Sequence, residues 1–120
     1  MSAVSTHVLD VAAGRPAAGM GVRLERGASA AELIAAASTD ADGRVAGLGP
    51  AALPAGTYRL IFETGGYLSR QQEGSAGTAP FFPEVTVTFT VAGEAGQHYH
   101  VPLLLSPFGY STYRGSWRGL

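Results

Sequence analysis

Alternating apolar and polar residues mark several short segments of this chain, and turns rich in Gly or Pro separate them. The clearest segment spans residues 85–91, where three threonines alternate with Val85, Val87, Phe89 and Val91. Successive side chains of a β-strand point to opposite faces, so this pattern predicts a strand with one buried face.

Four other segments are also predicted as strands: residues 4–11, 21–25, 32–38 and 57–63. In the first of these, His7 shares its face with Leu9, and Val8 is assigned to the core. The 32–38 segment contains residues with helical propensity, but its apolar part is short and turn residues flank it, so a strand is favoured. Turns are expected at residues 14–16, 40–43 and 50–56, and a helical turn or two within residues 67–73.

Residues 98–116 are the most informative stretch. Two apolar or aromatic runs flank Ser106-Pro107-Phe108-Gly109, a turn cluster with Pro second and Gly fourth, which predicts a β-hairpin with a four-residue loop. If Leu105 pairs with Tyr110, Leu104 lies opposite Ser111 and Pro102 lies opposite Tyr113. Pro102 itself marks an edge or unpaired position, because proline has no N–H for the ladder.

The predicted register separates the hairpin into two faces. Tyr99, Val101, Leu103, Leu105, Tyr110 and Thr112 form the face assigned to the core. The opposite face carries His98, His100, Pro102, Leu104, Ser111 and Tyr113. Two imidazoles and a phenol on one face indicate that the chemistry lies there, whereas a solvated surface of an ordinary hairpin is the alternative.

The strand pattern as a whole indicates an antiparallel β-sandwich of seven or eight short strands in a single domain, residues 1–120. The hydrophobic content of 46% and charged content of 14% are those of a folded chain. A net charge of −1 offers no basic surface for nucleic acid or an acidic membrane, and the absence of cysteine excludes disulfides and thiolate chemistry. No leader-like or membrane-spanning segment is visible, so a soluble, cytoplasmic protein is expected.

Several motifs resemble those of a known family. They are Ser5-Thr6-His7-Val8-Leu9-Asp10 with Gly14-Arg15-Pro16-Ala17, then Asp42-Gly43-Arg44, Phe82-Pro83-Glu84-Val85, and finally residues 104–116, which end in Tyr113-Arg114-Gly115-Ser116. Together they are similar to the signatures of the 5-hydroxyisourate hydrolases of the transthyretin-related family. The resemblance extends from about Val4 to Ser116.

The resemblance implies a transthyretin-like antiparallel β-sandwich of two four-stranded sheets with one short helix. It also implies a homotetramer whose active sites lie in a channel between dimers, with no cofactor and no metal. The implied reaction opens the ring of 5-hydroxyisourate to 2-oxo-4-hydroxy-4-carboxy-5-ureidoimidazoline in urate breakdown. The catalytic positions carried over by the motifs are His7, Arg44, His100, Tyr113 and Ser116, of which His7, Arg44 and Tyr113 are also expected to bind substrate.

These residue types suit the opening of a cyclic ureide. Histidine can activate water and protonate the leaving nitrogen, because its pKa lies near neutral pH. Arg44 offers a planar set of donors for a flat, anionic, carbonyl-rich ring and for developing oxyanion charge. Tyr113 and Ser116 can orient substrate or water. Direct water attack is expected, with His7 and His100 sharing acid–base work, and the sequence leaves open which of them is the base.

Three alternatives remain open on the residues alone. His98, His100 and His7 could be ligands of a catalytic zinc ion, although His98 is expected to be peripheral to the site. The chain could instead be a transthyretin-like carrier of a small aromatic ligand, or a non-catalytic sandwich module.

Trp117-Arg118-Gly119-Leu120 extends beyond the tetrapeptide that usually closes the family's chains, and it is expected to pack on its own or a neighbouring subunit.

Overall fold

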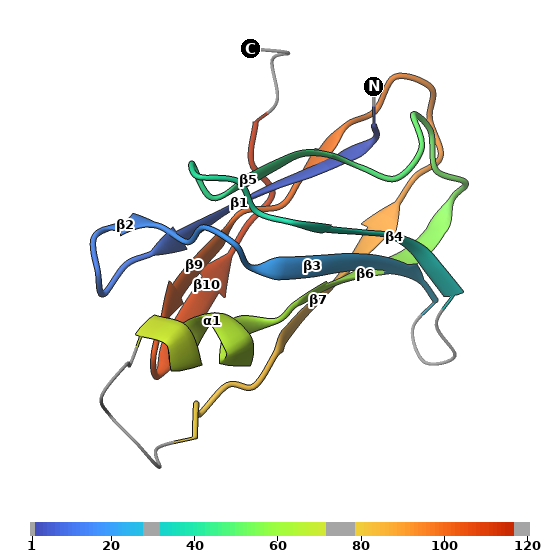
Figure 1. Cartoon of the computed structure of the whole chain (residues 1–120). Coiled ribbons are helices and arrows are strands. Elements are labelled where there is room, and N and C mark those ends of the chain that lie inside the picture. The colour runs from blue at the N-terminus through green and yellow to red at the C-terminus, as the bar shows by residue number, and fades with distance from the viewer. Residues whose placement is uncertain (1, 28–31, 72–78, 117–120) are drawn as a thin grey trace.

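Two β-sheets face each other in the computed structural model, which describes residues 2–27, 32–71 and 79–116, and one short helix lies at one end (Figure 1). This confirms the predicted all-β sandwich. The residues of the proposed C-terminal extension lie outside the described ranges, so the prediction about their packing is untested.

The first sheet is built around β1 (Val4–Asp10). Its other members are β2 (Arg15–Pro16), β5 (Arg44–Leu48), β8 (Tyr99–His100), β9 (Leu103–Ser106) and β10 (Gly109–Thr112). One edge of β1 pairs with β5 and then β2, and the other edge pairs with β8 and then β9. Six short strands therefore occupy four strand positions.

The sheets are mostly antiparallel, as expected, and the pairings of β1 with β8 and with β9 are parallel. The chain crosses from the second sheet into the first between β7 and β8, and it then runs in the same direction as β1. The break between β8 and β9 falls at Val101 and Pro102, which confirms the unpaired position predicted for this proline.

The second sheet has the order β4 (Glu32–Ser38), β3 (Gly21–Arg26), β6 (Gly56–Phe62) and β7 (Val85–Val91), with antiparallel pairs throughout. All four strands were predicted to within a residue or so at each end. Helix α1 (Thr64–Gln71) follows β6 and begins earlier than the predicted helical turns. Two strands were not predicted: β5, and β2, which falls in an expected turn.

The hairpin register was predicted correctly, since Tyr110 pairs with Leu105 and Ser111 with Leu104. The loop was wrong: Ser106 and Gly109 pair with each other, which leaves two residues in the turn instead of four. The assignment of Tyr110 to the core was also wrong, because its side chain is 44% exposed. Thr112 is exposed too. Both belong to β10, the edge strand, whose inward face is only partly covered.

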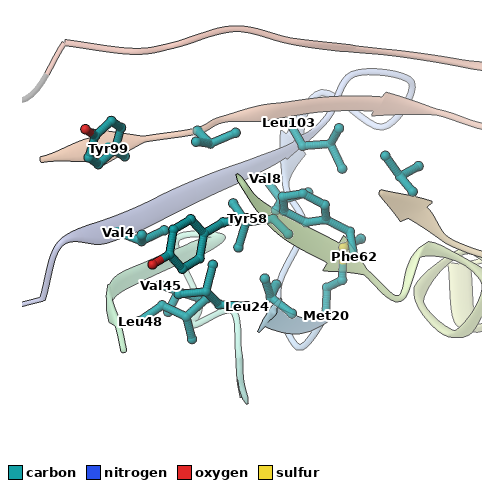
Figure 2. Packing of buried hydrophobic residues seen from close by; sticks show 14 of the residues in the cluster. Val4, Val8, Met20, Leu24, Val45, Leu48, Tyr58, Phe62, Tyr99 and Leu103 are labelled. Carbon is teal, nitrogen blue, oxygen red and sulfur yellow. The ribbon is translucent and has the colours of Figure 1, made fainter. Parts of the chain in front are cut away.

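The core lies between the two sheets (Figure 2). Val4 and Val8 of β1 and Leu103 of β9 meet side chains of the second sheet, among them Leu24 of β3 and Tyr58 and Phe62 of β6. The whole inward face of β1 is buried, so residues of odd number on this strand face outward, away from the core.

Candidate active site

The outward face of β1 carries Ser5, His7 and Leu9, as the alternation predicted. His7 and Leu9 are half-buried, whereas Val8 is fully buried. His7 lines a shallow hollow of about 540 Å³ with Leu9, Pro16, Asp42 and Arg44. The predicted sharing of one face by His7 and Leu9, with Val8 in the core, is thus confirmed.

Arg44 reaches the site because β5 pairs with β1 in a register that places Arg44 opposite His7. The turn before β5 sets this register. Gly43 has a φ of +74°, and its carbonyl oxygen accepts a hydrogen bond of 2.7 Å from the N–H of Val8. A Cβ at Gly43 would lie 2.4 Å from the Val8 carbonyl oxygen, so a larger residue does not fit this close approach.

Asp40 organises the same turn. Its Oδ1 accepts hydrogen bonds from the backbone N–H groups of Asp42 at 2.9 Å and Arg44 at 3.0 Å. The bond from Arg44 is the main cause that lowers the pKa of the Asp40 carboxyl group below its usual value. His7 is held by this turn as well: its Nε2 lies 2.9 Å from the Asp42 carbonyl oxygen, which can only accept, so Nε2 carries a hydrogen.

His100 enters the site from β8, where it pairs with Ser5 of β1. The Oγ of Ser5 lies 2.8 Å from Nδ1 of His100 and 2.8 Å from Nε2 of His98. Burial is the main cause that lowers the pKa of His100, and the charges of His98, His7 and Arg44 lower it further. Burial also lowers the pKa of His98. Both rings are therefore neutral near pH 7.

The tetrapeptide Tyr113-Arg114-Gly115-Ser116 packs against His100 through its glycine. The Gly115 N–H donates a hydrogen bond of 2.8 Å to the His100 carbonyl oxygen. A Cβ at Gly115 would lie 2.6 Å from Cδ2 of the His100 ring and 3.3 Å from Cγ of Pro102. Only glycine leaves the imidazole in its observed place. Ser116 follows directly and is exposed.

Tyr113 is not brought to His7 and Arg44 within this chain. It lies beyond the end of β10, is 56% exposed, and borders a different cavity of about 160 Å³. Val87 and Phe89 of β7 line the same cavity, and the guanidinium of neighbouring Arg114 lies 4.6 Å from the centre of the Tyr99 ring. The predicted sharing of one face by His100 and Tyr113 therefore does not extend past the strand end.

Sequence reasoning missed three residues that shape this site: Ser5, Asp40 and Gly115. Ser5 directly precedes the Thr6-His7 pair in the first motif, and the first position of a turn is a common place for an organising aspartate such as Asp40. Gly115 stands inside the terminal tetrapeptide. His98, expected to be peripheral, instead shares Ser5 with His100.

Among the described residues, no group of three or more His, Asp or Glu side chains could hold a metal ion. Within the same ranges, no helix has the length and apolar character needed to cross a membrane.

Known proteins resemble this chain over nearly its whole length. Residues 4–115 match the family described as the HIUase/Transthyretin family. The chain is 44% identical to the 5-hydroxyisourate hydrolase of Caulobacter vibrioides, over 97% of this chain and 100% of the relative. Among solved structures, the 5-hydroxyisourate hydrolase of Klebsiella pneumoniae superposes with a TM-score of 0.79 at 41% identity, covering 97% of this chain and 94% of the other. Transthyretin from Sparus aurata superposes with a TM-score of 0.82 at 32% identity, covering 94% and 96%.

Proposed function

This chain belongs to the HIUase/transthyretin family, and we propose that it is a hydrolase that opens 5-hydroxyisourate to 2-oxo-4-hydroxy-4-carboxy-5-ureidoimidazoline. One observation carries the proposal most directly: His7 and Arg44 are cross-strand partners on the face where His100 also lies. Acid–base groups and a cation on one face are what hydrolysis of a cyclic ureide requires.

The proposed mechanism is direct attack of water on a ring carbonyl. A neutral imidazole removes a proton from the water, and the pKa of His100 is lowered in the direction that keeps its ring neutral. Nε2 of His7 donates its hydrogen to the Asp42 carbonyl oxygen, so this ring can give a proton to the leaving nitrogen only from Nδ1, in its protonated form. One imidazole takes a proton from the attacking water. The leaving nitrogen of the substrate takes a proton from the other imidazole as the C–N bond breaks.

Arg44 is proposed to bind the substrate and to stabilise the oxyanion. Its guanidinium offers several N–H donors in a plane, which suits a flat, carbonyl-rich ring. The bonds from Asp40 hold the Arg44 backbone, so the base of this side chain is fixed beside His7 before substrate arrives. Such preorganisation lets the charge act on the transition state without rearrangement.

Tyr113 and Ser116 are proposed to orient the substrate in an assembled oligomer. Within one chain Tyr113 borders a separate cavity, so its role depends on how copies of the chain meet. Ser116 follows the glycine that contacts His100, which is consistent with a place at the mouth of the site.

We propose a homotetramer. In the described ranges β7 pairs only with β6, and β10 only with β9, and residues of both strands line one cavity, so two open edges lie at the same side of the sandwich. Open strand edges are suited to pairing with a second copy across a two-fold axis. The face with Leu9 and Leu104 supplies a second, partly apolar surface, and two kinds of two-fold interface generate a tetramer. A stable, active monomer in light scattering would contradict this.

A carrier function like that of transthyretin is the alternative from another class. The fold does not separate the two functions, because the Sparus aurata transthyretin and the Klebsiella pneumoniae hydrolase superpose almost equally well. The identities favour hydrolysis, since the hydrolases share more residues with this chain. The imidazoles of His7 and His100 can exchange protons, which favours catalysis over simple binding of a ligand.

The test is the ultraviolet absorbance of 5-hydroxyisourate, followed with the protein and in a blank without it. We expect the absorbance to decay faster with the protein, and equal decay would refute the proposed function. The same assay after treatment with a strong chelator addresses the zinc alternative. Activity is expected to survive, whereas loss that zinc restores would establish a catalytic metal.

A further inference from the structure

Ser5 has an unusual environment for a residue on the outward face of a sheet. By its position in β1 it points away from the core, yet it is 1% exposed, with the imidazoles of His98 and His100 each 2.8 Å from its Oγ. A serine hydroxyl has one hydrogen to donate, so it can donate to only one of these two ring nitrogens. The other nitrogen must donate its own hydrogen to Oγ. Ser5 therefore couples the protonation patterns of two histidines.

Backbone hydrogen bonds give this coupling a direction. The ring of His98 also bonds to the backbone of Ser2, in the sense that favours a protonated ring, which means that an N–H donates to a carbonyl. Because Nε2 of His98 contacts Oγ of Ser5, we assign the Ser2 bond to Nδ1. Neutral His98 then has its hydrogen on Nδ1, and Nε2 accepts the hydrogen of Ser5. Oγ of Ser5 must in turn accept from Nδ1 of His100, which the backbone of Ser5 favours as well.

Resting on the proposed function, we propose that Ser5 is a positioning residue: it holds neutral His100 with its hydrogen on Nδ1 and its lone pair on Nε2, and so makes His100 the general base. The hydrogen-bond chain runs from Nδ1 of His100 through Oγ of Ser5 to Nε2 of His98. Which nitrogen of a histidine carries the proton is set by the bond that the other nitrogen makes. His7, whose Nε2 hydrogen is bonded to the Asp42 carbonyl oxygen, then takes the role of acid through Nδ1 of its protonated ring.

Ser5 is not itself the nucleophile, because a side chain with 1% exposure cannot meet the substrate. The other groups around His100 do not replace its bond to Ser5. From β1 and β5 come the charges of His7 and Arg44, and from the loop before β8 that of His98, all of which disfavour a protonated His100. The C-terminal segment contributes Gly115, whose backbone packs on the ring and whose N–H bonds to the His100 carbonyl.

The direct test is ¹⁵N NMR of the wild-type protein with labelled histidine, at a pH where the rings are neutral. The shifts of the two ring nitrogens distinguish the tautomers, and a His100→Asn sample assigns the signals. We expect hydrogen on Nδ1 of His100, and hydrogen on Nε2 would overturn the proposal. This readout does not depend on activity: a wild-type protein that leaves 5-hydroxyisourate intact would refute the proposed function, and the tautomer would still be measured.

Kinetics then test whether the tautomer matters. In Ser5→Ala we expect a mixture of His100 tautomers and a kcat lower by about tenfold to a hundredfold, as for other partners that orient a functional histidine, with little change in KM. Ser5→Thr keeps the hydroxyl, so it should restore the Nδ1–H form of His100 and most of the rate. Ser69→Ala, on the exposed side of α1, is the control and should behave as wild type. A rate loss in Ser5→Ala without a change of tautomer would overturn the proposal, as would a Ser5→Thr protein with the Nδ1–H form and no recovery.

Discussion

Replacing Gly115 with alanine should disable His100 without unfolding the protein. A Cβ at this position would lie 2.6 Å from Cδ2 of the imidazole. Gly115 does not have a positive φ, so alanine introduces no backbone strain and acts through the contacts of its Cβ, of which the one with the His100 ring is the shortest. The ring must move, because the alternative is to shift the backbone that bonds to the His100 carbonyl at 2.8 Å.

The size of the effect follows from the geometry. Carbon atoms in favourable contact are about 3.5 to 4.0 Å apart, so the ring or the backbone must yield by about 1 Å. A displacement of about 1 Å in a catalytic group can cost about a hundredfold in rate. The cost in stability should be smaller, about 1 to 3 kcal/mol, which is typical of one added methyl group in a packed position.

Gly109→Ala is the matched control. It lies in the same hairpin, and its Cβ would meet only Oγ of Ser106, at an ordinary 3.7 Å. We expect 5-hydroxyisourate turnover by Gly109→Ala to equal that of wild type, while Gly115→Ala loses about a hundredfold in kcat with its fold retained by circular dichroism. Wild-type kcat in Gly115→Ala would refute the view that the tetrapeptide positions the His100 ring.

Other predictions concern stability, pH and the C-terminus. Gly43→Ala should lower the free energy of unfolding in urea by more than Gly14→Ala, because both have positive φ but only Gly43 would place a Cβ against a carbonyl oxygen, at 2.4 Å. The pKa values of His98 and His100 are lowered from 6.5 in the folded protein, so the unfolded chain binds more protons below that pH. The free energy of unfolding should therefore be constant above about pH 6.5 and fall as the pH drops below it. The acid limb of kcat/KM should also lie below pH 6.5. Urea titrations across a pH series give the free energy of unfolding, and rates across the same series give kcat/KM. An acid limb above pH 6.5 would contradict the lowered pKa values of these histidines. Deleting residues 117–120 should change tetramer stability or KM while kcat stays within a few-fold, and unchanged melting temperature and KM would indicate a frayed end.

The faces of the strands could be predicted because alternation is a local property. Val8 buried beside half-buried His7 and Leu9, and the register of Leu105 with Tyr110, both follow from period-two patterns and turn chemistry. The outward placement of His7 needed nothing more than this rule.

The pairings between distant segments could not be predicted in the same way. In β5 only Val45 and Leu48 are buried, and the register against β1 shifts between Val4 and Thr6, so no alternation marks this strand. The parallel pairing of β1 with β9 depends on where the chain crosses between sheets. Ser5 lies beside His100 only because β8 also pairs with β1 in parallel.

Tyr113 shows where extrapolation from a strand ends. Counting faces along the hairpin placed it with His100, but β10 ends at Thr112, and Tyr113 borders the cavity beside β7. Face assignment holds only while the backbone remains extended and paired.

The most direct measurement of the central claim compares 5-hydroxyisourate decay, followed by ultraviolet absorbance, with wild-type protein and with His100→Asn at equal concentration. Asparagine keeps a polar side chain of similar reach but cannot accept a proton near neutral pH. The account predicts a folded His100→Asn protein whose rate is at least about a hundredfold lower, the usual contribution of a positioned acid–base group. Wild-type turnover by His100→Asn would remove this histidine from the mechanism and contradict the account.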